Sequence, residues 1–153
     1  KDIIHNFKYK KISCLGKYFA EKMYFYFNKD LISTIDLIIP APIHKNRLFQ
    51  RGFNQSEKTA SHLSNLSKIK LNTKLLYKKT DTISQTKLNR KERLTNIQNS
   101  FILKKNKNIK IPKHILLIDD IRSTGSTTNE CIKTLKYLNK DINFSIMLIA
   151  INQ

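Results

Sequence analysis

Residues 115–127 read ILLIDDIRSTGST, and the fold class can be predicted from this stretch. Its first four residues are apolar and form the short continuous run that is typical of a buried parallel strand. The run ends in two acids, Asp119 and Asp120, and a turn rich in hydroxyl groups follows around Gly125. Beyond the turn, apolar residues recur at helical spacing. The stretch therefore predicts a strand and a helix joined by a short polar loop.

The loop between this strand and this helix has the composition of an anion site. Thr127 with Glu130 fits a capping box, which predicts that the helix begins here. The free N–H groups and the positive dipole end of a helix N-terminus favour a phosphate. Asp119 and Asp120 would repel that phosphate, so we expect them to bind hydroxyl groups or a hydrated metal ion beside it. These residue types predict a site for a phosphorylated ribose; the alternative is two solvated acids and a polar turn.

Apolar patterns along the rest of the chain alternate between strand and helix. Continuous apolar runs predict strands at 37–39, 71–77 and 144–151, and helical spacing predicts one or two helices in 1–30 and one in 55–66. The aromatic residues of the first segment are expected mainly in the core. This alternation predicts an α/β fold with a largely parallel, twisted sheet flanked by helices. The site is then expected at the carboxyl ends of the strands.

The charge of the chain points to a polyanionic partner. The 153 residues include 29 lysines and arginines against 11 acids, a formal net charge of +18. Residues 68–113 hold 14 of these basic residues against two acids, a net charge of +12. Binding to a phosphate backbone explains this excess better than solubility does. A coding bias toward lysine is the alternative for part of it.

Length and the remaining composition bound the class of protein. A chain of 153 residues with 40% hydrophobic content fits one globular domain. Cys14 and Cys131 lack metal-binding spacing and are expected to be buried, reduced thiols. No secretory signal or long apolar run is present, which predicts a cytoplasmic protein.

Residues 115–127 resemble the phosphoribosyl pyrophosphate (PRPP) signature of type I phosphoribosyltransferases. That signature has four hydrophobic residues, two acids, two variable residues, and then Ser/Thr, Ser/Thr, Gly, any residue and Ser/Thr. The resemblance implies a type I phosphoribosyltransferase fold over 1–153, with 1–34 as a helical hood and 35–153 as the core. It implies that Asp119 and Asp120 hold the ribose hydroxyls and, through PRPP, a Mg²⁺ ion. The residues implied to bind the 5′-phosphate are Ser123, Thr124, Gly125, Ser126 and Thr127.

Two further patterns resemble the ComF family of this fold. Residues 40–60 read PAPIHKNRLFQRGFNQSEKTA and match its PxPxxxxRxxxRGFNQ pattern before a helix for which Asn54 with Glu57 is a capping signal. Residues 85–96 match its QxxLxRxxRxxN pattern. By position the first segment resembles the pyrophosphate loop and the second the flexible loop that closes over PRPP. The residues implied to bind pyrophosphate are Arg47, Arg51, Arg90 and Arg93.

The family resemblance implies a role in natural transformation, in which the protein binds single-stranded DNA and Mg²⁺-PRPP. It implies a helicase-like competence protein and the inner-membrane DNA channel as partners, and a location in the cytoplasm or at the inner-membrane surface. The lysines expected at the DNA are Lys45, Lys78, Lys79, Lys87, Lys91, Lys104 and Lys105. Two alternatives stay open: an active phosphoribosyltransferase of nucleobase salvage, and a regulator that senses PRPP without turnover.

Overall fold

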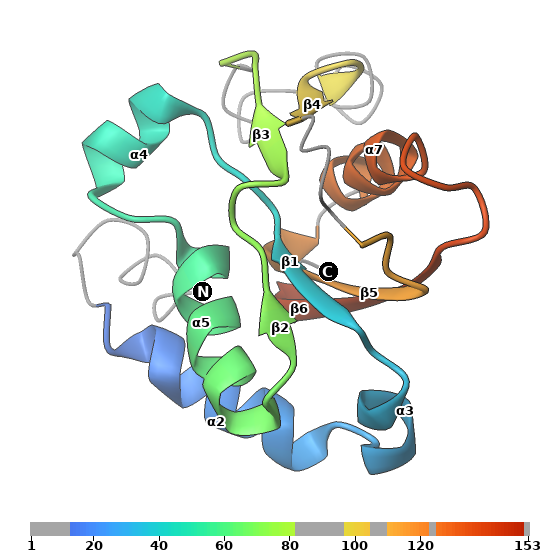
Figure 1. The fold of residues 1–153 in the computed structure, drawn as a ribbon. Helices are drawn as coiled ribbons and strands as arrows, with labels where there is room; N and C mark the ends of the chain where they lie inside the picture. The colour runs from blue at the N-terminus through green and yellow to red at the C-terminus, as the bar shows by residue number, and fades with distance from the viewer. Residues whose placement is uncertain (1–12, 82–96, 105–109, 123–124, 152–153) are drawn as a thin grey trace.

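The computed structural model describes residues 13–81, 97–104, 110–122 and 125–151, and its centre is a parallel sheet (Figure 1). Four strands form this sheet in the order β2-β1-β5-β6. Every neighbouring pair is parallel. The strands are β1 (Leu37–Pro40), β2 (Lys70–Leu71), β5 (His114–Arg122) and β6 (Asn143–Ile151). The predicted α/β class with a largely parallel sheet is confirmed.

Helices cover both faces of the sheet, as the continuous apolar run of β5 requires. Leu116 and Ile118 pack beneath α2 (Leu15–Tyr26) and α5 (Gln55–Ser67). Ile115 and Leu117 point to the other face, toward α7 (Ser126–Leu135). All four side chains are fully buried. Since successive side chains of a strand alternate between faces, a strand covered on both sides has no polar position in its buried part.

A second, smaller sheet lies over the α7 face. It pairs β3 (Leu76–Lys78) antiparallel with β4 (Phe101–Leu103). The sequence predicted a single strand over 71–77, and this is wrong, because β2 ends at Leu71 and β3 starts a different sheet. The break has a local cause: the side chain of Asn72 accepts a hydrogen bond from the N–H of Lys74 at 2.9 Å, a turn that competes with strand pairing.

The segment after β1 was expected to be a loop and contains the short helix α4 (Lys45–Arg51). His44 caps its start by accepting the N–H of Asn46. Gly52 ends it in the left-handed conformation, with φ 81°, which glycine adopts without steric cost. Asn54 then caps α5 by accepting the N–H of Ser56 at 3.1 Å. The predicted start of α5 is confirmed.

The expectation that the aromatic residues of the first segment lie mainly in the core is wrong for most of α2. Phe19 is half-buried, and Phe27, directly after the helix, packs against the core. Tyr18, Tyr24, Phe25 and Tyr26 are exposed, by 42–79%. Small residues make the contact with α5 instead: Gly16 and Ala20 are the buried residues of α2. A Cβ atom at Gly16 would lie 3.0 Å from Lys58 Cβ, so the helices are too close for larger side chains between them.

A second short helix, α3 (Lys29–Ser33), connects α2 to β1. Among the residues that the structure describes, no helix is long and apolar enough to cross a membrane.

Candidate functional site

Strand β5 carries the acid pair past the end of its neighbour β1. The register pairs Pro40, the last residue of β1, with Ile118. Beyond this pair only β6 continues beside β5, with Leu148 opposite Asp119. The sequence predicted a loop from Ile121 onward, directly after the acids, whereas pairing with β6 extends the strand to Arg122. Asp119 and Asp120 therefore lie on a strand at the carboxyl edge of the sheet, where sites of open α/β sheets form.

The two carboxylates differ in exposure. Asp119 is buried, with 7% of its surface exposed. Its Oδ1 accepts the backbone N–H of Asp120 at 2.8 Å. Asp120 is only partly buried. The arrangement offers one carboxylate held within the edge of the sheet and a second that faces out from it.

The start of α7 follows the acids, but not with the predicted cap. The N-cap residue is Gly125 in the left-handed conformation, φ 74°, and no side chain caps the helix. Glu130 cannot complete a capping box, because its Oε1 accepts the backbone N–H of Asn99 at 2.8 Å. The helix begins at Ser126, so Ser126 and Thr127 lie in its first turn. Glycine adopts this conformation without steric cost, and the positive dipole end of α7 follows it.

Part of the predicted phosphate site lies outside the described residues. Ser123 and Thr124 belong to that part, as do Arg90 and Arg93. The three described members of the predicted loop, Gly125, Ser126 and Thr127, are buried or half-buried at the helix start.

Arg47 and Arg51 lie one helical turn apart on α4, so their side chains leave the helix on the same side. Arg47 Nε lies 3.6 Å from Asp81 Oδ1. Arg51 donates to Gln55 Oε1 at 3.3 Å. Arg47 thus lies beside the residues that follow β3, and Arg51 lies at the start of α5. Guanidinium groups suit the predicted role in binding an anion.

Asp81 is a site residue that the sequence analysis missed. Its carboxylate accepts the side-chain N–H of Asn46 at 2.7 Å, and this hydrogen bond, with Arg47 nearby, lowers the pKa of Asp81. It ties the residues after β3 to α4. The signal available in the sequence was its rarity, because Asp81 is one of only two acids among 14 basic residues in 68–113.

Lys78 belongs to the acid site as well as to the basic surface. Its pKa is lowered from 10.5 to about 8, mainly by burial and next by the positive charge of Arg47, while Asp119 acts in the opposite direction. Its Nζ lies 5.6 Å from the centre of the Phe101 ring. Lys78 therefore lies within electrostatic reach of both Asp119 and Arg47. An anion bound among these residues would restore its charged form.

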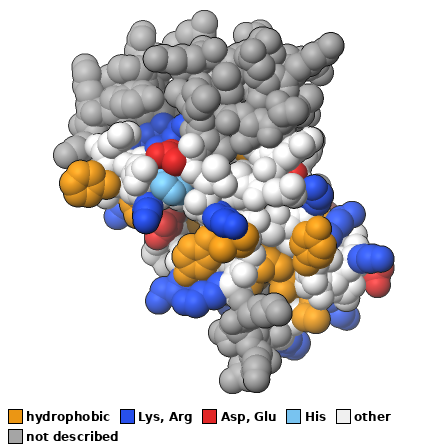
Figure 2. All heavy atoms as spheres, turned by 90° about the horizontal axis from the view of Figure 1, so that it is seen from above, with side chains coloured by type: hydrophobic (Ala, Val, Ile, Leu, Met, Phe, Trp, Pro, Cys, Tyr) orange, Lys and Arg blue, Asp and Glu red, His pale blue; other side chains and the backbone are white. Residues whose placement is uncertain are grey.

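Those of the expected DNA-binding lysines that the structure describes lie at the same end of the molecule as the acid site. Figure 2 views the carboxyl ends of the strands and shows Lys and Arg side chains beside exposed hydrophobic groups. Lys104 Nζ lies 6.0 Å from the centre of the Tyr77 ring, and Lys45 and Lys79 are exposed. Lys87, Lys91 and Lys105 lie outside the described residues. The described part of this surface combines cations with aromatic rings, a combination that suits single strands.

The two cysteines differ in environment. Cys131 is fully buried in the core beneath the small sheet. Burial raises its pKa well above the usual value, and Asp119 adds to the effect. Cys14 is exposed, contrary to the expectation. Both are free thiols.

The carboxylates at this site fit a metal ion that binds together with a phosphorylated ligand. No group of three His, Cys, Asp or Glu side chains could hold a metal ion among residues 13–81, 97–104, 110–122 and 125–151. The carboxylate pair Asp119 and Asp120 supplies only oxygen donors. Mg²⁺ is commonly held by one or two carboxylates together with the phosphates of a substrate. The described residues suit that arrangement.

Comparison with known proteins gives the relationship of the chain. No family model matches it. It is 34% identical over 103 residues to competence protein F of Haemophilus influenzae. The aligned segment covers 67% of this chain and 45% of that protein. It is 30% identical over 103 residues to the DNA utilization protein YhgH of Escherichia coli O6:H1, covering 65% of this chain and 43% of that protein.

The chain thus spans less than half the length of the curated relatives it matches. The identity to competence protein F agrees with the patterns found at 40–60, 85–96 and 115–127. The chain belongs to the ComF family of competence proteins.

Proposed function

We propose that this protein acts in DNA uptake during natural transformation, and that it binds Mg²⁺-PRPP and single-stranded DNA through a type I phosphoribosyltransferase fold. The observation that carries the proposal is the acid pair Asp119 and Asp120 at the carboxyl edge of the sheet, directly before the glycine-capped start of α7. The names of the relatives, competence protein F and DNA utilization protein, support the DNA-handling half.

The proposal of PRPP binding rests on two kinds of group at the carboxyl edge of the sheet, one that favours anions and one that favours hydroxyl groups and cations. The positive dipole end at the start of α7 favours the 5′-phosphate. The carboxylates of Asp119 and Asp120 accept hydrogen bonds from ribose hydroxyls and suit Mg²⁺. Lys78 supplies positive charge within electrostatic reach of Asp119, and Arg47 adds positive charge near Lys78, where the pyrophosphate of the same ligand would lie. One ligand that carries a phosphate, two hydroxyls and a pyrophosphate satisfies all of these groups.

The DNA half rests on charge and on the exposed rings at the same end of the protein. The net charge of +18 far exceeds what a single small anion requires. A strand that engages about five phosphates would give a log-log salt slope of roughly −3.5. A helicase-like competence protein and the inner-membrane channel are the partners that fit this role, and they would place the protein at the cytoplasmic side of that membrane.

Transfer of the ribose to a nucleobase is a second candidate, favoured by one observation. Lys78 lies within electrostatic reach of both Arg47 and Asp119, so Lys78 and Arg47 could stabilise the departing pyrophosphate as the base nitrogen bonds to the sugar carbon. Release of pyrophosphate that depends on one particular base would establish this activity. A PRPP-sensing regulator would show no turnover but a reciprocal effect of each ligand on the affinity of the other.

Calorimetric titration of Mg²⁺-PRPP, with and without a short single-stranded oligonucleotide, tests the proposal. We expect binding by the wild-type protein and none by the double variant Asp119→Asn/Asp120→Asn, because the amides remove both charges at constant shape. The matched control is Asp141→Asn, an exposed acid, which should bind normally.

The two halves fail separately. Absence of PRPP binding in the wild-type protein would reject the ligand half. A DNA affinity that does not change with salt concentration would reject the DNA half, because contacts to phosphates release counterions.

A further inference from the structure

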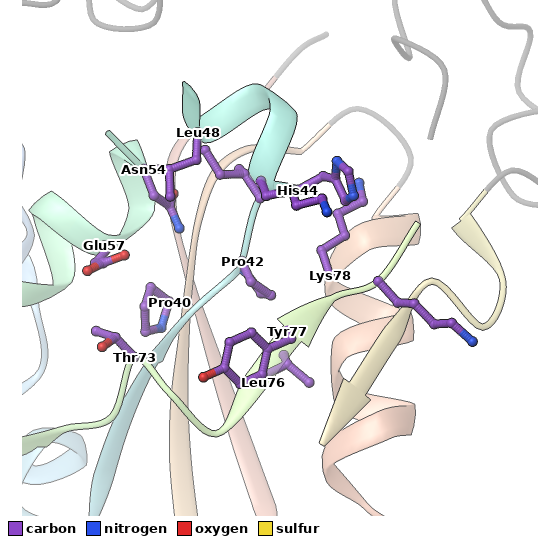
Figure 3. Close-up of a pocket in the computed structure, with 13 residues that line it drawn as sticks. Pro40, Pro42, His44, Leu48, Asn54, Glu57, Thr73, Leu76, Tyr77 and Lys78 are labelled. Atoms are coloured by element: carbon purple, nitrogen blue, oxygen red, sulfur yellow. The ribbon is translucent and has the colours of Figure 1, made fainter. Parts of the chain in front are cut away.

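A pocket of about 430 Å³ opens beside the end of β1, on the side of β2 (Figure 3). Its size falls within the range of about 300–1,000 Å³ that is usual for small-ligand sites. It is lined by the residues that follow β1, by the starts of α4 and α5, and by β3 with the residues before it. It adjoins the acid site, because Lys78 lines the pocket and also interacts electrostatically with Asp119. Asp119 and Asp120 themselves lie on β5, the other neighbour of β1.

The chemical groups around this pocket change from one end to the other. Figure 3 shows Glu57 and Thr73 on the side of α5 and His44 and Lys78 on the opposite side, with Tyr77 between them. Glu57 and Thr73 offer oxygen acceptors. Lysines 45 and 79 also line the pocket and are exposed.

The middle of the pocket is flat and apolar. Pro40, Pro42 and the ring of Tyr77 all line the pocket (Figure 3). Tyr77 is 38% exposed, so one part of the ring is available to a ligand. Flat rings stack on such surfaces regardless of their exact identity. The pocket thus presents acceptors, a stacking surface and cations in that order.

We propose that this pocket binds one nucleotide of single-stranded DNA, with the base stacked on Tyr77 and the flanking phosphates at Lys45 and Lys79. A nucleotide has the same three parts in the same order: a base edge with hydrogen-bond donors, a flat ring and an anion. The carboxylate of Glu57 would accept from the exocyclic amino group of cytosine or adenine and would find no such donor on thymine. The inference rests on the proposed DNA binding and adds where the strand is held and which bases are preferred.

Substitution of Tyr77 separates stacking from charge. We expect Tyr77→Ala to weaken binding of a short oligodeoxycytidine about 5- to 100-fold, with an unchanged salt slope because no phosphate contact is lost. Tyr77→Phe should bind like the wild type. The control is Tyr26→Ala, which truncates an equally aromatic side chain that is 77% exposed on α2. Lys45→Ala/Lys79→Ala should instead reduce the magnitude of the salt slope by roughly 1.4.

Base preference gives a second, independent readout. The wild-type protein should bind oligodeoxycytidine roughly tenfold more tightly than oligodeoxythymidine, and Glu57→Gln should reduce this preference. Free deoxycytidine monophosphate, tested in the same way, distinguishes a mononucleotide site from a strand site. Binding of the monophosphate as tight as that of the strand would overturn the assignment to DNA.

Photo-crosslinking tests the wild-type protein without any variant. An oligonucleotide that carries 5-iododeoxycytidine should crosslink to the peptide that contains Tyr77. Crosslinks confined to other peptides, or equal losses of affinity in Tyr77→Ala and Tyr26→Ala, would overturn the inference while DNA binding itself stands. If the wild-type protein binds no DNA at all, the proposed function and this inference both fail.

Discussion

The buried position of Lys78 makes a prediction about stability that can be worked from the structure. Its pKa is lowered from 10.5 to about 8, with burial as the main cause. The unfolded chain therefore holds a proton on this side chain between about pH 8 and pH 10.5 that the folded protein has lost. Stability must rise with pH across this window, because the unfolded state binds more protons there.

The magnitude follows from the same difference. At about 1.36 kcal/mol per pKa unit, a charged Lys78 costs the folded protein about 3 kcal/mol at neutral pH. Solvent screening of a partly exposed group reduces this to about 1–2 kcal/mol. Lys78→Met keeps the aliphatic part of the side chain against Phe101 and removes the charge, so it should be more stable than the wild type at pH 7 by about that amount.

Urea denaturation at pH 7 and pH 9.5 checks this. The advantage of Lys78→Met over the wild type should shrink by about 1 kcal/mol at the higher pH, because the wild-type lysine is then mostly neutral in the folded protein. Lys79→Met is the control, since Lys79 is the exposed neighbour and should stay within about 0.5 kcal/mol of the wild type at both pH values. An advantage of Lys78→Met that is absent, or that does not depend on pH, would refute the reasoning.

Three other predictions concern the acid site and the core. Gly125→Ala should destabilise the protein by about 1–2 kcal/mol in urea, because φ is 74° there, and should weaken PRPP binding; an unchanged midpoint would contradict this conformational role. Asp36 accepts hydrogen bonds from the backbone N–H groups of His114 and Lys113 at the start of β5. Both bonds lower the pKa of Asp36, and the one from His114 has the larger effect. Its contribution is present above pH 3.8 and is lost as the pH falls through the lower folded pKa, so Asp36→Asn should lose stability at pH 7 and show a flatter acid limb by circular dichroism. A thiol reagent should modify Cys14 at once and Cys131 only on unfolding; two rapidly reacting thiols would disprove the core position of Cys131.

Local patterns were enough where the cause of a structure is local. The apolar run 115–118 specified a strand buried on both faces, and the acids after it specified the functional edge. Asn54 specified the start of α5, because a capping side chain needs only its own neighbours. The capping box at Thr127 failed for a non-local reason: Glu130 bonds to Asn99, 31 residues away in the chain.

By itself, then, the sequence determined the α/β class, the order of the main strands along the chain, and the acid pair with the glycine turn that follows it. Only the tertiary structure decided how far β5 runs, because that depends on pairing with β6 rather than with β1. It also decided that Tyr18, Tyr24, Phe25 and Tyr26 of α2 are exposed, since Gly16 and Ala20 bring that helix close to α5. Lys78 is the clearest case: its charge is visible in the sequence, but its partial burial and its interactions with Arg47 and Asp119 arise from elements that are far apart in the chain and meet only when it folds.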